Sequence, residues 1–325
     1  MSGNRAGGPV DRAAVEERVL REWGFELPDS LFRFWDFLGS LGPAEERARQ
    51  DLMVSPAGIL DLFADPGLLP RDGIDGRVHG RYYRDPPEFL TFLHGGSDGL
   101  HFGLWFDDGR TCTGVASYYN NDGGDIDTHP ATPLEALRSV IELAWRDLAD
   151  DMQEEGTSGR LADLGLLRDA LTALETGDRS ETGLAYSQAY AWNRRPVDPG
   201  RVTTLDGAGA RVSGETALGR PAHHGADAYT FATHLYALFD DPAALEAAVR
   251  EARGRCAAGD PAEALVLGRD LHWASGGDPD REALATELLT TAYRALGRPG
   301  LAEIAEAHHR HRSLPHVTVL EPRPA

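Results

Sequence analysis

The stretch Arg81-Tyr82-Tyr83-Arg84-Asp85-Pro86-Pro87-Glu88-Phe89 is the most distinctive run in this chain of 325 residues. Its two consecutive prolines restrict the backbone between two acidic side chains. Arginine, tyrosine and carboxylate groups in a rigid segment suit a recognition surface. They suit equally well an internal network of salt bridges and turns. The residues of this 81–89 segment leave both interpretations open.

Short β-type runs surround the 81–89 segment. The candidates are residues 81–83, 89–93, 100–106 and 112–119, separated by Asp-Pro-Pro, Gly-Gly and Asp-Asp-Gly turns. Such close spacing predicts an antiparallel meander. Because side chains alternate along a strand, His101, Gly103 and Trp105 are expected together on one surface, beside the 81–89 segment. The predicted partner- or ligand-binding residues are therefore Arg81, Tyr82, Asp85, Glu88, His101, Trp105, Asp107, Tyr118 and Asn120.

Helical patterns flank this sheet. Apolar residues at helical spacing predict helices over about 11–23, from Asp29 or Ser30 onward, and over 44–52. Residues 65–80 are rich in Gly, Pro and Asp and are interpreted as a loop. After the sheet, Thr132-Pro133-Leu134-Glu135 has the form of a capping box, which predicts a helix reaching about Asp150.

The C-terminal part is mainly helical in pattern. One helix is expected over about 161–174, three begin at Asp-Pro pairs (241–242, 260–261 and 278–279), and one covers about 300–310. Residues 176–225 show little periodicity, and residues 317–320 form a possible final strand. We predict an α+β fold: a flexible N-terminus at 1–10, a mixed α/β domain with a small antiparallel sheet at 11–155, and a mainly α-helical domain at 156–325.

Composition excludes several classes of function. The formal net charge is −20, which disfavours binding to nucleic acid and to anionic membranes but permits a basic partner. Every cationic side chain is arginine, so lysine Schiff-base chemistry is excluded. The chain has neither an apolar run of roughly 18 residues nor a hydrophobic N-terminal stretch, so a cytoplasmic location is expected.

No residue pattern indicates a metal or a cofactor. Cys112 and Cys256 are isolated, so a thiolate zinc site is not indicated. Gly207-Ala208-Gly209 lacks the third glycine of a dinucleotide loop and is interpreted as a turn. The histidines near the C-terminus are interpreted as a solvated helix end: His308, His309, His311 and His316.

Several stretches in chain order together resemble the histone PARylation factor family. They are residues 25–37 (FELPDSLFRFWDF), 79–89 (HGRYYRDPPEF), 101–108 (HFGLWFDD), 204–209 (TLDGAG), 267–271 (LGRDL), and 301–304 with Arg312-Ser313. The N-terminal part is also similar to Smi1/Knr4-type (SUKH) modules, which include bacterial binding and immunity proteins. The resemblance implies an ADP-ribosylation-linked protein whose C-terminal domain resembles that of the family, and the absence of lysine suggests a bacterial origin.

The resemblance also implies where catalysis would occur. Family members act with a poly(ADP-ribose) polymerase and supply an acidic residue as general base on a serine hydroxyl. Extending the match at 267–271 upstream without gaps puts Ala257 and Ala258 at the acidic positions. Asp260 and Glu263 lie nearby and are weak catalytic candidates, since the local pattern uses them as a helix-capping pair.

Three hypotheses follow. The leading one is an accessory or binding protein linked to ADP-ribosylation that lacks the acid pair, with an ADP-ribosyltransferase as its partner. The second is an immunity-type protein whose acidic surface caps a basic toxin. The third is a stand-alone enzyme with a pocket that includes Tyr118, in which His101 is the acid/base and Asp107 orients it.

Overall fold

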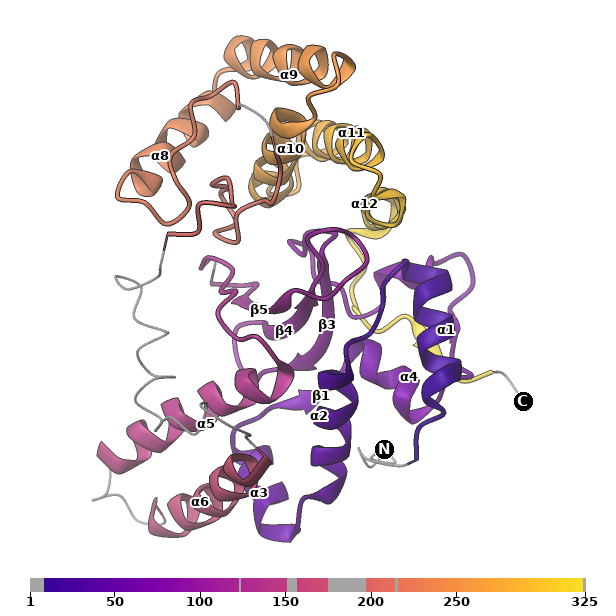
Figure 1. Ribbon diagram of the computed structural model, residues 1–325, viewed down its shortest axis with the longest axis vertical. Helices are drawn as coiled ribbons and strands as arrows, with labels where there is room; N and C mark the ends of the chain where they lie inside the picture. Colours follow the sequence, from indigo (N-terminus) through magenta and orange to yellow (C-terminus); the bar gives the residue numbers. More distant parts are fainter. Residues whose placement is uncertain (1–8, 123, 151–156, 175–196, 214–215, 324–325) are drawn as a thin grey trace.

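A four-stranded antiparallel sheet lies at the centre of the computed structural model, between N-terminal helices and an all-helical C-terminal region (Figure 1). The structure describes residues 9–122, 124–150, 157–174, 197–213 and 216–323. The strand order is β1 (Ser55–Pro56), β3 (Phe89–His94), β4 (Leu100–Trp105) and β5 (Gly114–Tyr119). The predicted α+β class and the antiparallel meander are confirmed.

The predicted strand at residues 81–83 is wrong, because this stretch is a turn. The Arg81 guanidinium donates to the carbonyl oxygens of Pro86 (2.8 Å) and Phe89 (2.7 Å), and the Asp85 carboxylate accepts from Tyr82 N (2.7 Å). These bonds fold the segment back on itself instead of leaving it extended for pairing. The strand predicted at 112–119 begins two residues later, at Gly114.

Both faces of the central strand β4 are buried. The register pairs His101 with Tyr118 and Trp105 with Phe89, so these side chains share one face. Helix α10 (Ala262–Ala274) covers that face: Trp273 packs on Tyr118 with ring centroids 5.2 Å apart. The expectation of an exposed His101 and Trp105 is therefore wrong, since the side chains are 0% and 1% exposed.

The opposite side of the sheet packs on the N-terminal helices. Phe34 of α2 (Asp29–Ser40) meets Phe92 edge to face, at 5.5 Å between ring centroids. Helix α5 (Pro133–Asp150) packs against α2, and the other long helices before the sheet are α1 (Arg12–Trp23) and α3 (Pro43–Asp51). The Thr132 half of the predicted capping box is confirmed, because Glu135 N donates to Thr132 Oγ1 (3.2 Å). The Glu135 carboxylate accepts from Ala131 N (2.7 Å), one residue before the expected Thr132 N.

Residues 55–80 hold several short elements, of which the last two lie within the loop predicted at 65–80. The elements are β1, the 3-10 helix η1 (Gly58–Leu60), α4 (Asp61–Ala64), β2 (Leu69–Pro70) and the 3-10 helix η2 (Gly76–Val78). Strand β2 pairs with β6 (Leu320–Glu321), which is the predicted final strand displaced toward the C-terminus. The paired residues Pro70 and Leu320 are 250 positions apart in the chain, so local periodicity could not show their pairing.

Helix α6 (Thr157–Leu174) packs against α3 and α5, on the N-terminal side of the molecule (Figure 1). Asp163 of α6 pairs with Arg47 at 2.9 Å, and Arg168 pairs with Glu142 at 2.6 Å. The predicted boundary between residues 155 and 156 falls in 151–156, outside the described residues, and it stays a prediction.

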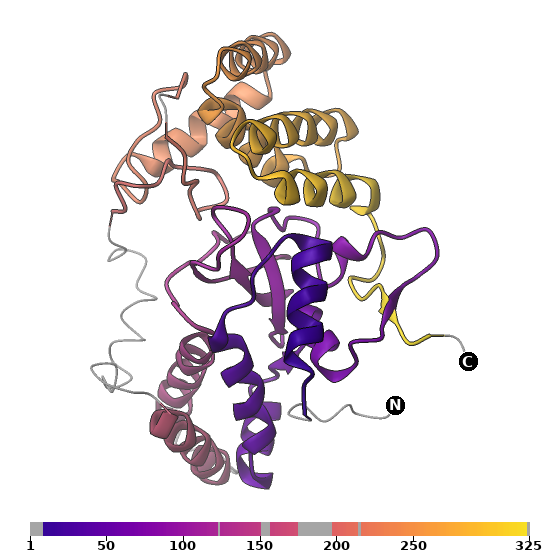
Figure 2. The same ribbon diagram turned by 45° about the vertical axis from the view of Figure 1, so that its right-hand side comes forward.

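The C-terminal helices are α8 (Ala228–Phe239), α9 (Pro242–Ala257), α10, α11 (Pro279–Ala295) and α12 (Pro299–His311), and they stack above the sheet (Figure 2). The predicted N-caps Asp241 and Asp278 are confirmed, since their carboxylates accept from the first backbone amides. At α10 the N-cap is Pro261 rather than the predicted Asp260.

Candidate functional site

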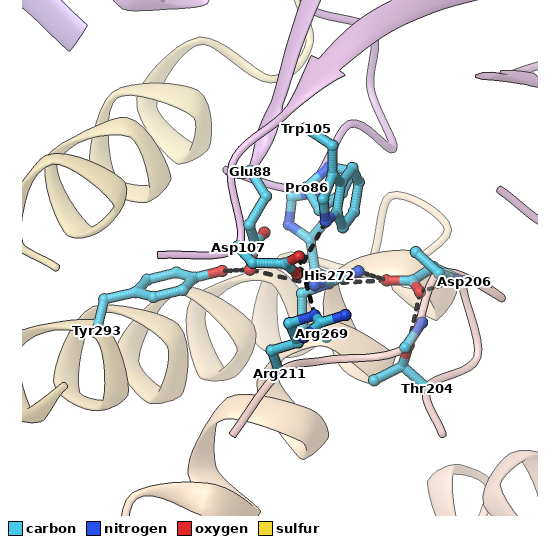
Figure 3. Close-up of polar contacts among 12 residues, drawn as sticks. Pro86, Glu88, Trp105, Asp107, Thr204, Asp206, Arg211, Arg269, His272 and Tyr293 are labelled. Atoms are coloured by element: carbon cyan, nitrogen blue, oxygen red, sulfur yellow. Dashed lines mark hydrogen bonds and ion pairs between the residues drawn. The ribbon is translucent and has the colours of Figure 1, made fainter. Parts of the chain in front are cut away.

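Arg269 of α10 lies at the centre of a buried charge cluster that joins the sheet to the C-terminal helices (Figure 3). Its guanidinium bonds to Asp206 Oδ2 at 2.5 and 2.7 Å and to Glu88 Oε1 at 3.1 Å. The Tyr293 hydroxyl of α11 also donates to Glu88 Oε1, at 2.8 Å. Burial alone would lower the pKa of Arg269, but the carboxylates of Asp206 and Glu88 raise it above its usual value.

Burial and Glu88 together raise the pKa of Tyr293 well above its ordinary value, so the phenol stays protonated as a donor. Arg269 also lies over the Trp105 ring, with 5.2 Å from its central carbon to the ring centroid. One guanidinium thus links the 81–89 segment, strand β4 and the loop that contains Asp206.

The loop at residues 204–209 is shaped by its own side chains. Asp206 Oδ1 accepts from Thr204 Oγ1 (2.6 Å) and from Ala208 N (3.0 Å), and Thr204 Oγ1 accepts from Gly209 N (3.0 Å). Gly207 and Gly209 have φ values of +81° and +67°, a region that favours glycine. The interpretation of Gly207-Ala208-Gly209 as a turn is confirmed, and the turn orients Asp206 toward Arg269.

Asp107 takes part in a neighbouring ion pair. Its carboxylate bonds to Arg201 at 2.7 and 2.9 Å. It also accepts from the indole nitrogen of Trp105 at 3.0 Å (Figure 3). Asp107 is 6% exposed. The residue therefore fixes the loop after Asp198 against the end of β4.

Asp270 follows Arg269 and faces a different partner. Its carboxylate lies 2.6 Å from Arg220 Nη2 and accepts from Leu205 N at 2.7 Å. Burial raises the pKa of Asp270 to about 6, and Arg220 opposes that shift. Glu263, 1% exposed, accepts from Ala217 N at 2.8 Å and lies 3.6 Å from the same arginine.

Asp85 organises a third network, under the 81–89 segment. Its Oδ1 atom accepts from the Tyr118 hydroxyl and lies 2.7 Å from His101 Nε2. The other ring nitrogen of His101 is 2.8 Å from Gly99 O, so both nitrogens of this buried imidazole have partners. The predicted pairing of His101 with Asp107 is therefore wrong, and the enzyme hypothesis loses its acid/base pair.

The loop between α9 and α10 differs from these clusters. Ala257, Ala258 and Gly259 are exposed, and Asp260 is partly exposed. Asp260 Oδ1 accepts from Ala262 N at 3.2 Å, and its Oδ2 is 4.0 Å from Arg255. Asp260 thus supports the start of α10, whereas Glu263 makes no capping bond to Asp260, whose backbone N–H donates instead to Arg255 O. The predicted capping pair is wrong for Glu263.

The structure brings most of the predicted site residues into one continuous buried region, held by contacts to the C-terminal helices. Tyr82 and Asn120 are the two that retain partial exposure, and a direct partner contact stays a prediction for all nine. Two of them have arginine partners that no sequence pattern indicated: Asp107 pairs with Arg201, and Glu88 pairs with Arg269. Arg269 lies inside the LGRDL stretch at residues 267–271, which is the one sequence signal near these partners.

Among the described residues, no group of three or more His, Cys, Asp or Glu side chains is arranged to hold a metal ion. Within the same part of the chain, no helix combines the length and the apolar character needed to cross a membrane.

Comparison with known proteins points to one family. The family model described as histone PARylation factor 1 matches residues 14–164. Histone PARylation factor 1 of Danio rerio is 29% identical over 96 residues, which span 29% of this chain and 28% of that protein. The matched segment thus covers well under half of the curated relative. Residues 14–164 are thus similar to the histone PARylation factor 1 family.

Proposed function

We propose that this protein is an accessory or binding protein for an ADP-ribosyltransferase, and that it lacks the acid pair its relatives are expected to supply. The observation that carries the proposal is the exposed end of α9, where the last helical residue Ala257 and the C-cap Ala258 stand where the resemblance predicts acids. Alanine cannot accept a proton. The family match supports the link to ADP-ribosylation. A bacterial origin and a Smi1/Knr4-like domain at residues 11–155 stay predictions.

Asp260 is the carboxylate nearest to these alanines along the chain. The proposal has two forms, catalytic and purely binding, which differ in the role of Asp260. Its bond to Ala262 N gives it a structural role at the start of α10. If Asp260 also acts as the general base in a joint active site, the protein is conditionally catalytic. If it does not, the protein acts by binding alone.

The test combines the purified protein with a cognate ADP-ribosyltransferase and NAD, and measures both complex formation and ADP-ribose transfer. We expect binding, with transfer changed in rate or in acceptor residue. Asp260→Asn separates the two forms, and Glu251→Gln is its matched control, because Glu251 pairs with the same Arg255 at 2.9 Å. The absence of both binding and any effect on transfer would overturn the proposal.

A second candidate, an immunity-type protein that caps a basic toxin, is favoured by the net charge of −20. A neighbouring toxin gene whose basic product binds this protein would support it. Tight binding to an ADP-ribosyltransferase with no such neighbour would argue against it.

A further inference from the structure

A cavity of about 210 Å³ lies between the 81–89 segment and the C-terminal end of α12. It is separate from the Arg269 cluster and is lined by residues from three parts of the chain: Arg81, Tyr82, Asn120, His308, Arg312 and His316 are among them. Its volume lies below the roughly 300–1,000 Å³ typical of sites for drug-sized molecules, which favours a small ligand.

Three polar atoms in the cavity wall are buried and have no hydrogen-bond partner: Arg81 Nε, His308 Nδ1 and Asn120 Oδ1. Arg81 and His308 are 7% and 2% exposed, so the interpretation of His308 as part of a solvated helix end is wrong. A buried polar group without a partner costs about 1–3 kcal/mol, so a ligand that satisfies all three atoms would gain from each.

The charge of the wall is positive. Among the described residues that line the cavity there is no Asp or Glu. Arg81 and Arg312 both line it. The terminal nitrogens of Arg81 donate to backbone carbonyls, and Asp85 is bound to Tyr118, His101 and Tyr82 N. Arg312 donates to Tyr83 O at 2.8 Å and lies 3.9 Å from Glu282. Burial lowers the pKa of both arginines, as expected where a charge is incompletely compensated.

The unpaired atoms also define the pattern of hydrogen bonds. Arg81 Nε–H is a donor, and Asn120 Oδ1 is an acceptor because Asn120 Nδ2 already donates to Asn121 (3.1 Å). Burial lowers the pKa of His308 well below its usual value, so the ring is neutral, and a hydrogen bond to the Tyr82 backbone leaves Nδ1 as an acceptor. A suitable ligand must accept from the arginine and donate to the other two atoms.

We propose that this cavity binds a small hydroxylated anion, the chemistry shared by sugar phosphates and hydroxy acids. The anionic oxygen would lie beside Arg81, and hydroxyl groups would donate to His308 and Asn120. The aromatic rings in the wall are already engaged, since Tyr82 stacks on His101 at 4.2 Å and Arg312 covers Tyr83 at 4.1 Å. The site therefore recognises charge and hydroxyl groups and not an aromatic base.

The test is calorimetric titration of the full-length protein with ribose 5-phosphate, malate, inorganic phosphate and ribose. We expect ribose 5-phosphate or malate to bind. The one that binds more tightly shows whether the ligand is a sugar phosphate or a hydroxy acid. Inorganic phosphate and neutral ribose should each bind at least about tenfold more weakly, because each lacks half of the pattern. No heat from either hydroxylated anion at about 10 mM, or phosphate binding as tightly as both, would overturn the proposal.

A pair of variants locates the site. Asn120→Asp places a negative charge in the cavity wall and should weaken binding at least about tenfold. Asn121→Asp is the matched control, because it makes the same charge change one residue away on an exposed side chain outside the lining. Thermal melting checks that both variants are folded. Equal weakening by the two variants, or an unchanged His308 ring resonance on binding to the wild type, would contradict the proposed site.

Discussion

Helix α10 and the loop before it present two contrasting kinds of charged environment. Along the helix, Arg269 and Asp270 are almost completely buried, and each has a partner of opposite charge. Where α9 ends and the loop begins, Ala257 and Ala258 are exposed and carry no charge. The buried groups can hold the molecule together but are closed to a substrate. A reaction at an exposed acceptor would depend on the loop, where the chain offers only Asp260.

The largest effect is expected from Arg269→Met, which removes the charge that joins Glu88 to Asp206. The buried carboxylates of Glu88 and Asp206 would lose the positive charge of Arg269. We therefore expect a loss of about 3–5 kcal/mol in the free energy of unfolding, measured by urea denaturation. The control is Arg253→Met, since Arg253 pairs with Glu287 at the surface and should contribute less than about 1 kcal/mol. Similar losses for the two variants would show that burial does not distinguish them.

Acid sensitivity should come from buried histidines of the C-terminal part. Burial lowers the pKa of His223 to about 3 and that of His272 and His308 well below the usual value. Below pH about 6.5 the unfolded state therefore binds more protons than the folded state, so stability falls as the pH falls. Each histidine contributes up to about 1.4 kcal/mol per pH unit in this range.

Asp270 opposes this trend in part. Because its folded pKa is raised to about 6, the folded state takes up a proton more readily than the unfolded state between about pH 6 and 4. His223→Gln should flatten the loss of stability between about pH 6.5 and 5. The exposed His234→Gln should leave the slope unchanged, and a parallel slope for both variants would contradict the assignment.

A smaller loss of stability is expected when glycine is replaced by alanine, and it should depend on whether other atoms surround the glycine. Gly80 and Gly73 have nearly the same φ, +73° and +76°, but a Cβ at Gly80 would lie 2.7 Å from Gly58 Cα, whereas one at Gly73 meets nothing within 4 Å. Gly73→Ala should cost about 1 kcal/mol from backbone conformation alone. Gly80→Ala should cost a further 1–3 kcal/mol, roughly, from overpacking. Equal melting temperatures for the two variants would show that the backbone near Gly58 shifts to make room for the added Cβ.

The sequence predicted what depends on local pattern. Helical periodicity, the Thr132 capping box and the Asp241 and Asp278 N-caps were visible because each lies within a few residues of its partner. The pairing of β2 with β6 and the covering of β4 by α10 were not, since both depend on contacts between distant segments.

The same reason explains the outcome at the candidate site. Alternation along β4 correctly placed His101 and Trp105 on one face, but it carried no information on what covers that face. The arginine partners come from segments about 90 to 180 residues away, as in Arg201–Asp107 and Arg269–Glu88. A run of charged residues that is buried looks the same in sequence as one that is exposed.

The smallest effect on stability is expected where the functional consequence is greatest. Ala258→Glu adds an acid at an exposed position that ends α9, so the cost should stay within about 1 kcal/mol, mostly from the helix dipole. If the missing acid is what separates this chain from a catalytic accessory factor, the variant should increase ADP-ribose transfer to serine by the partner enzyme.

Ala247→Glu is the matched control for that gain, because it makes the same charge change on an exposed position of α9 away from the loop. An increase with Ala258→Glu alone would assign the effect to the position of the carboxylate and not to added charge. An equal increase with both would indicate that net charge tunes the association. If transfer is already high in the wild type and lost in Asp260→Asn, then Asp260 acts as the general base. In that case the catalytic acid lies a few residues further along the chain than Ala257 and Ala258 and has not been lost.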